Sequence, residues 1–205
     1  MNRIDTVVFD IGNVLIQWDP RHLYRSVFAD AAEMEHFLAH VCTMEWHVEH
    51  DRGLSFADNA ARLKAVHPDH ADLIDIWGAR YPEMTPDRVP GTAALLRGLK
   101  EAGHAVHGLT NMPPDFFPVL SELYPELHLL DETVISGDEG IIKPDPRIYE
   151  ILIGRTGLDP ARTLFVDDSR SNVEAAARLG FAVHRFEHAE GLGCELRRFG
   201  LISLE

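Results

Sequence analysis

The stretch at residues 5–15, DTVVFDIGNVL, constrains the fold more than any other part of the chain. Its β-branched and aromatic run is typical of a buried strand, and the Gly-Asn pair after it predicts a turn. The strand leaves one carboxylate, Asp10, at its carboxyl end. Ligands bind at this edge of open α/β sheets, so Asp10 is either a functional group or a simple turn former.

The second half of the chain alternates helical apolar stripes with short apolar runs. The runs at residues 105–109, 133–136, 163–166 and 181–183 predict strands, and the segments between them predict helices. Such alternation implies right-handed crossovers and a mainly parallel sheet covered by helices on both faces. We therefore expect a doubly wound α/β core.

Local signals predict where several helices begin. Asp19 and Asp145 each precede a proline, and an aspartate cap followed by proline favours the start of a helix. Ser171 and Glu174 fit a capping box for a helix that runs through Leu179.

Residues 17–84 differ from the rest because they contain helical apolar stripes but no convincing strand. The stripes are typical of a small helical bundle, and the proline-rich segment 81–90 predicts a connector back to the sheet. We expect a core made of residues 1–16 and 85–205. Residues 17–84, called the cap below, are expected to lie next to Asp10.

Composition narrows the class of protein. The 205 residues carry a formal net charge of -14, which disfavours nucleic-acid and anionic-membrane surfaces. Cys42 and Cys194 form neither a disulfide framework nor a metal-binding spacing, which fits a reducing compartment. No apolar run reaches membrane-spanning length and no signal peptide precedes the first strand. We expect a cytoplasmic protein that binds neither nucleic acid nor membranes.

Polar side chains follow the predicted strands at four places: Asp10, Thr110 with Asn111, Lys143, and Asp167 with Asp168. Because the carboxyl ends of parallel strands share one edge of a sheet, these groups are expected to converge. A carboxylate there can attack phosphorus, while a hydroxyl, backbone N–H groups and a lysine hold the phosphoryl oxygens. Paired carboxylates are hard oxygen ligands that suit Mg²⁺. The pattern predicts phosphoryl transfer, although each group alone also fits a capping turn or a solvated loop.

In this order, the residues resemble the motifs of the haloacid dehalogenase (HAD) superfamily over nearly the whole chain, and the cap resembles the C1 cap of that family. The resemblance implies that Asp10 is the nucleophile, Thr110 with Asn111 forms the second motif, and Lys143 is the third-motif lysine.

The resemblance also implies a Mg²⁺ site. Asp10, the Gly12 carbonyl and Asp168 are expected to bind the ion, with Asp167 behind them near Lys143. Asn172 is expected to orient Asp168.

Gly12 departs from the usual family pattern, which has a second aspartate two residues after the nucleophile. That aspartate serves as general acid and then base, a role typically worth about 10²–10⁴ in rate. Gly12 can offer its backbone carbonyl to a metal but cannot carry a proton. A subgroup of sugar-phosphate phosphatase-like members shares this Asp-x-Gly-Asn pattern.

The segment 46–53, WHVEHDRG, is the part of the cap most suited to a polar substrate. We expect Trp46, His47, His50 and Arg52 to bind substrate. His47 or His50 is a candidate for supplying the proton that Gly12 cannot. The alternative is a solvated helix end.

The leading functional prediction is Mg²⁺-dependent hydrolysis of a small phosphate monoester, such as a sugar phosphate, through an aspartyl-phosphate. One alternative is a 2-haloacid dehalogenase, in which Asp10 attacks carbon without a metal. That branch typically has an aromatic residue in place of Gly12. The other alternative is a protein that binds a small phosphorylated metabolite with little or no turnover.

Overall fold

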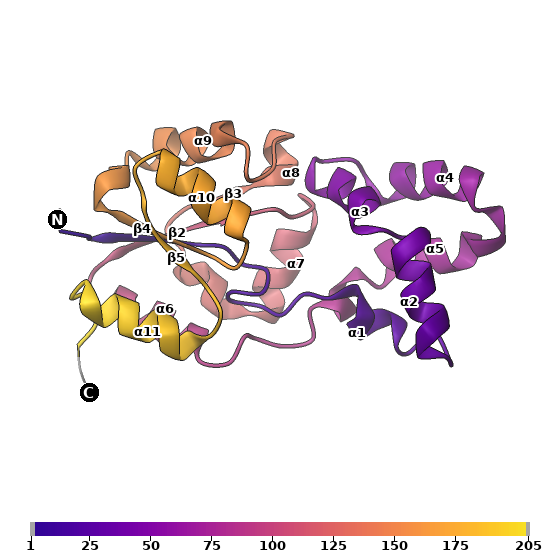
Figure 1. Cartoon of the computed structure of the whole chain (residues 1–205), viewed down its shortest axis with the longest axis horizontal. Helices are drawn as coiled ribbons and strands as arrows, with labels where there is room; N and C mark the ends of the chain where they lie inside the picture. Colours follow the sequence, from indigo (N-terminus) through magenta and orange to yellow (C-terminus); the bar gives the residue numbers. More distant parts are fainter. Residues whose placement is uncertain (1–2, 204–205) are drawn as a thin grey trace.

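A computed structural model describes residues 3–203 (Figure 1). Five strands form one sheet in the order β3-β2-β1-β4-β5, and every neighbouring pair is parallel. The strands are β1 (Thr6–Phe9), β2 (Ala105–Thr110), β3 (Thr133–Ile135), β4 (Thr163–Asp167) and β5 (Ala182–Arg185). β1 is central and pairs along its whole length with β2 on one side and β4 on the other. The expected parallel α/β fold is confirmed.

Both faces of the sheet are covered by helices, and β1 shows why. Val7 and Phe9 belong to one hydrophobic cluster, whereas Val8 between them belongs to another, because successive strand side chains point to opposite faces. Helices lie on both sides of the sheet (Figure 1). The first cluster includes residues of α6 (Thr92–Glu101), α7 (Phe116–Leu123) and α11 (Ala189–Arg198). The second cluster includes residues of α9 (Pro146–Thr156) and α10 (Arg170–Arg178). Shorter turns are η3 (Pro125–Leu129), α8 (Ser136–Glu139) and η4 (Pro160–Arg162).

The cap lies beyond the carboxyl ends of the strands (Figure 1). Its elements are α1 (Pro20–Tyr24), α2 (Ala31–His40), α3 (Met44–Asp51), α4 (Phe56–Val66), η1 (Pro68–His70), α5 (Ala71–Ala79) and η2 (Tyr81–Met84). Tyr24, Phe37 and Trp77 form part of its aromatic interior. These side chains belong to the same hydrophobic cluster as Phe9, so packing is continuous from the cap into the sheet. The domain boundaries at residues 16 and 85 stay a prediction.

Helix starts agree with the sequence signals at two positions and differ at a third. Asp19 and Asp145 each accept a hydrogen bond from the backbone two residues later, as aspartate caps do. The capping box is wrong, because α10 begins at Arg170 and places Ser171 inside its first turn. Glu174 pairs instead with Arg170 at 2.8 Å. Within residues 3–203, no helix is both long and apolar enough to cross a membrane.

Candidate active site

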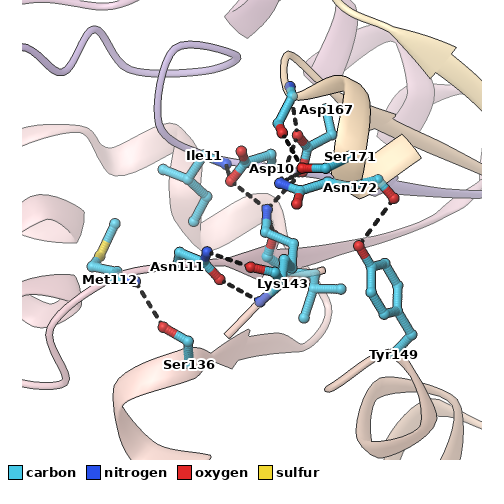
Figure 2. A network of polar contacts seen from close by, with 12 residues as sticks. Asp10, Ile11, Asn111, Met112, Ser136, Lys143, Tyr149, Asp167, Ser171 and Asn172 are labelled. Atoms are coloured by element: carbon cyan, nitrogen blue, oxygen red, sulfur yellow. Dashed lines mark hydrogen bonds and ion pairs between the residues drawn. The ribbon is translucent and has the colours of Figure 1, made fainter. Parts of the chain in front are cut away.

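Lys143 lies at the centre of the polar groups that follow the strands (Figure 2). Its Nζ is 2.9 Å from Asp10 Oδ1 and 2.7 Å from Asp167 Oδ2, and it also donates to the Leu109 carbonyl at 2.7 Å. All three N–H groups of the ammonium therefore have an acceptor. Burial opposes the charge of Lys143, but the two carboxylates outweigh burial and raise its pKa, so this side chain is a fixed cation.

Asp167 is held from several directions and is fully buried. Besides Lys143, the Ser169 backbone N–H donates to its Oδ1 at 2.8 Å. The Asn172 amide donates to both carboxylate oxygens, at 3.0 and 3.1 Å. Asn172 thus orients Asp167, not Asp168 as the sequence analysis expected. The difference arises because α10 starts two residues earlier than expected, and its first turn faces the end of β4.

The second-motif residues lie at different depths. Asn111 lines the cavity and clamps the Lys143 loop, because its amide donates to the Lys143 carbonyl at 3.1 Å and its Oδ1 accepts from the Lys143 N–H at 2.8 Å (Figure 2). Thr110 ends β2 and is buried behind the residues that line the cavity. The catalytic roles of both residues stay predictions.

Asp10, Asp167 and Asp168 form an acidic cluster, with one carboxylate oxygen of each within 4.8 Å of the others. Burial raises the pKa of Asp10 to about 7, although Lys143 pulls it down. Burial, together with the charge of Asp167, also raises the pKa of Asp168. Three carboxylates share one lysine, so the cluster favours a further cation, and its all-oxygen donor set fits a hard divalent ion.

The turn after Asp10 explains the Gly-Asn pair. Asn13 adopts a left-handed backbone with φ of 56°, a region that asparagine tolerates better than most residues. Its Oδ1 accepts the Trp18 backbone N–H at 2.9 Å, which fixes the chain as it enters the cap. Gly12 is not in the left-handed region, and a Cβ built on it would meet nothing within 4 Å.

A cavity of about 170 Å³ separates the acidic cluster from the cap. Asp10, Gly12, Asn111, Lys143, Asp168 and Asn172 line its core side. The opposite wall is largely aromatic and apolar, and its main residues are Trp18, Met44, His47, Asp51, Tyr81, Met112 and Phe116. The core side, called the floor below, is therefore charged, whereas the opposite wall is mainly apolar.

Only one of the four expected substrate-binding residues of the cap lines this cavity. His47 does so, with its ring stacked on Trp18 at a centroid distance of 4.8 Å. Trp46 and His50 lie on another face of α3 and contact Asn59 of α4 instead. Arg52 is exposed and pairs with Glu49. Their placement does not support substrate contact for Trp46, His50 or Arg52.

Sequence reasoning missed Asp51, which lines the cavity and is only 6% exposed. It stands four residues after His47, so the two share one face of α3. This spacing was the available signal. The local sequence did not indicate that the face with His47, and not the face with Trp46, points to the cavity.

Comparisons with known proteins agree with this geometry. A family profile described as haloacid dehalogenase-like hydrolase matches residues 4–180. A sesquiterpene phosphatase of Aspergillus oryzae is 29% identical over 84% of this chain and 85% of its own length. A flavin mononucleotide hydrolase of Arabidopsis thaliana is 26% identical over 97% of this chain and 79% of its own.

Solved structures show the same fold. A HAD family enzyme of Bacteroides thetaiotaomicron matches with a TM-score of 0.74 at 21% identity, over 96% of this chain and all of that one. The same enzyme in complex with magnesium and inorganic phosphate gives a TM-score of 0.66 at 19% identity, over 90% and 95% of the two chains. The profile spans most of the sequence, and the strand order and acidic edge agree with it. The chain therefore belongs to the haloacid dehalogenase-like hydrolase family.

Proposed function

We propose that this hydrolase is a Mg²⁺-dependent phosphatase that cleaves a small phosphate monoester through an aspartyl-phosphate on Asp10. The observation that carries the proposal is the position of Lys143, 2.9 Å from Asp10 and within the acidic cluster. A nucleophile, a fixed cation and oxygen ligands for a metal then share one cavity. The phosphatase and mononucleotide hydrolase among the relatives support the same class of substrate.

The residues divide the chemistry as follows. The Ile11 N–H, at 2.7 Å, and Lys143 both donate to Asp10 Oδ1, which fixes the carboxylate and leaves Oδ2 to attack phosphorus. Lys143 also neutralises charge on the transferring phosphoryl group. Asp10, Asp168 and the Gly12 carbonyl would hold Mg²⁺, with Asp167 behind them. The bound ion would neutralise the phosphoryl oxygens and allow an ionised Asp10.

The cavity wall supports an apolar or aromatic leaving group more than the sugar phosphate expected from sequence. Trp18, Met44, Tyr81, Met112 and Phe116 offer mainly carbon surface. A sugar hydroxyl buried without a hydrogen-bond partner would cost about 1–3 kcal/mol. The small volume favours a leaving group about the size of one ring or a short chain.

A substrate panel with and without Mg²⁺ tests the proposal. Aryl and short alkyl phosphates should be hydrolysed only with Mg²⁺, and 2-haloacids should be inert. Asp168→Asn should weaken Mg²⁺ binding in calorimetry and lower turnover, whereas Asp69→Asn, at an exposed carboxylate of the cap, should change neither. Metal-independent release of halide would favour the dehalogenase alternative. Phosphate binding with no turnover of any ester would favour the binding-protein alternative.

A further inference from the structure

The family's usual proton donor has no counterpart at Gly12, yet the space for one exists. Gly12 lines the core side of the cavity, and a Cβ built on it would meet nothing within 4 Å. An alkyl alcohol leaves phosphorus as a strong base, so its departure needs a proton from another group. That group must border the same cavity and face the leaving-group side, which the cap forms.

We propose that Asp51 of α3 donates this proton to the leaving alcohol and later accepts one from the attacking water. The inference rests on the proposed phosphatase function. Asp51 lines the cavity opposite Asp10 and Gly12, and its Oδ1 is buried with no hydrogen-bond partner among residues 3–203. His47 Nε2 lies 3.6 Å from this oxygen, beyond hydrogen-bond distance. A buried, unpartnered carboxyl oxygen at a cavity is free to contact a substrate.

The end of α3 is fixed against the core, which gives Asp51 a defined position. Ser136 Oγ donates to the Asp51 carbonyl at 2.6 Å and accepts the Met112 N–H at 3.0 Å. Two residues after Asp51, the backbone of Gly53 packs so closely that an added Cβ would lie 2.5 Å from the Gly137 carbonyl oxygen. The donor is therefore held by the core that carries Asp10, a requirement for efficient proton transfer.

Burial and the neighbouring charges together favour the protonated form of Asp51 below about pH 7. Burial raises its pKa to about 7, and the charge of Asp10 adds to this effect, while Lys143 and Arg52 act in the opposite direction. Tyr81, in the same wall, stays neutral because burial raises its pKa. A neutral Asp51 also avoids repelling a phosphate dianion.

The two histidines of α3 are poorer donors than Asp51. Burial lowers the pKa of His47 to about 3 and that of His50 to about 4, so both are neutral at pH 7. His50 also lies outside the cavity lining. These positions favour Asp51 over the histidines that the sequence suggested.

The proposed reaction has two halves, and Asp51 gives up a proton in the first and regains one in the second. Asp10 forms a bond to phosphorus as the bond from phosphorus to the ester oxygen breaks, and the Asp51 proton passes to that oxygen, releasing the alcohol. In the second half, water attacks phosphorus and gives a proton to the Asp51 carboxylate, while the bond between phosphorus and the Asp10 oxygen breaks. Inorganic phosphate leaves, and both carboxyl groups return to their starting states.

Leaving-group dependence tests the role of Asp51. Asp51→Asn keeps the size and polarity of the side chain but removes the acid. The variant should lose about 10²-fold or more in kcat/KM with propyl phosphate, because kcat/KM reports the step in which the alcohol leaves, and less than about tenfold in kcat/KM with p-nitrophenyl phosphate. Asp51→Glu should recover part of the alkyl activity. Glu45→Gln, at an exposed position of the same helix, should change neither rate.

The pH profile gives a second readout that needs no variant. Because the raised pKa leaves Asp51 protonated below about pH 7, alkyl ester turnover should fall as the pH rises through that value. The aryl ester should show a much weaker fall. Matching profiles, or equal losses in kcat/KM on both esters in Asp51→Asn, would overturn the donor role while leaving the phosphatase proposal intact. A wild-type protein inert to both esters would overturn both.

Discussion

The floor and the wall of the cavity differ in whether their buried polar atoms have hydrogen-bond partners. On the core floor, all three N–H groups of Lys143 have acceptors, and Asp167 accepts from Lys143, Ser169 and Asn172. On the cap wall, Asp51 Oδ1 and His47 Nδ1 are buried without a partner among residues 3–203. A fully paired network holds charges in a fixed arrangement, whereas unpaired buried atoms cost stability and are typical of positions reserved for a ligand. The difference fits the proposed division of roles, in which the floor holds the reacting groups in place and the wall meets the leaving group.

The largest expected effect comes from the floor. Asp10→Asn replaces the nucleophile with an amide of the same shape, so turnover should fall by at least about 10⁴-fold. Circular dichroism and thermal unfolding should show an intact fold, because the Ile11 N–H can still bond to the remaining carbonyl oxygen. Near-normal hydrolysis by the folded variant would exclude a covalent aspartyl-phosphate.

Two further variants compare how much a residue of the floor and a residue of the wall contribute to the free energy of unfolding. Lys143→Met leaves Asp10 and Asp167 buried without their cation, so it should lower the free energy of unfolding by about 3–5 kcal/mol. His47→Leu removes a polar atom that has no partner in the described residues, so it should cost less than about 1 kcal/mol. Urea denaturation at pH 7 measures both variants. Equal losses would show that the floor is not the specially stabilised region.

The smallest expected effect comes from a substitution on the floor that supplies the proton otherwise provided by Asp51 on the wall. Gly12→Asp adds the family's usual acid at a position with open space and an ordinary backbone, so the variant should fold. It should raise kcat for propyl phosphate about tenfold and restore much of the activity lost in Asp51→Asn, because either carboxyl can supply the proton. Steady-state kinetics with propyl and p-nitrophenyl phosphate measure the change. If a folded variant with normal Mg²⁺ affinity changes both rates equally, proton donation is not what Gly12 lacks.

Much of the floor was predictable because its residues are tied to local patterns. A buried run in a parallel sheet fixes where its carboxyl end lies, so Asp10 and Asp167 could be placed at one edge before the structure was known. Lys143 could be placed at the same edge because it lies in the loop before α9. The partner of Asn172 was not predictable, since a shift of two residues in a helix start changes what the first turn faces.

Strand periodicity and strand ends are local features, so the parallel sheet, the helices of residues 17–84 and the polar groups at the strand ends could be predicted without the structure. The face of α3 that meets the cavity could not, because it depends on tertiary packing. His47 and Asp51 line it while Trp46 and His50 pack on α4, and local sequence does not distinguish these two faces. The choice depends on how α3 docks against α4 and the core through Asn59 and Ser136, contacts between residues far apart in the chain.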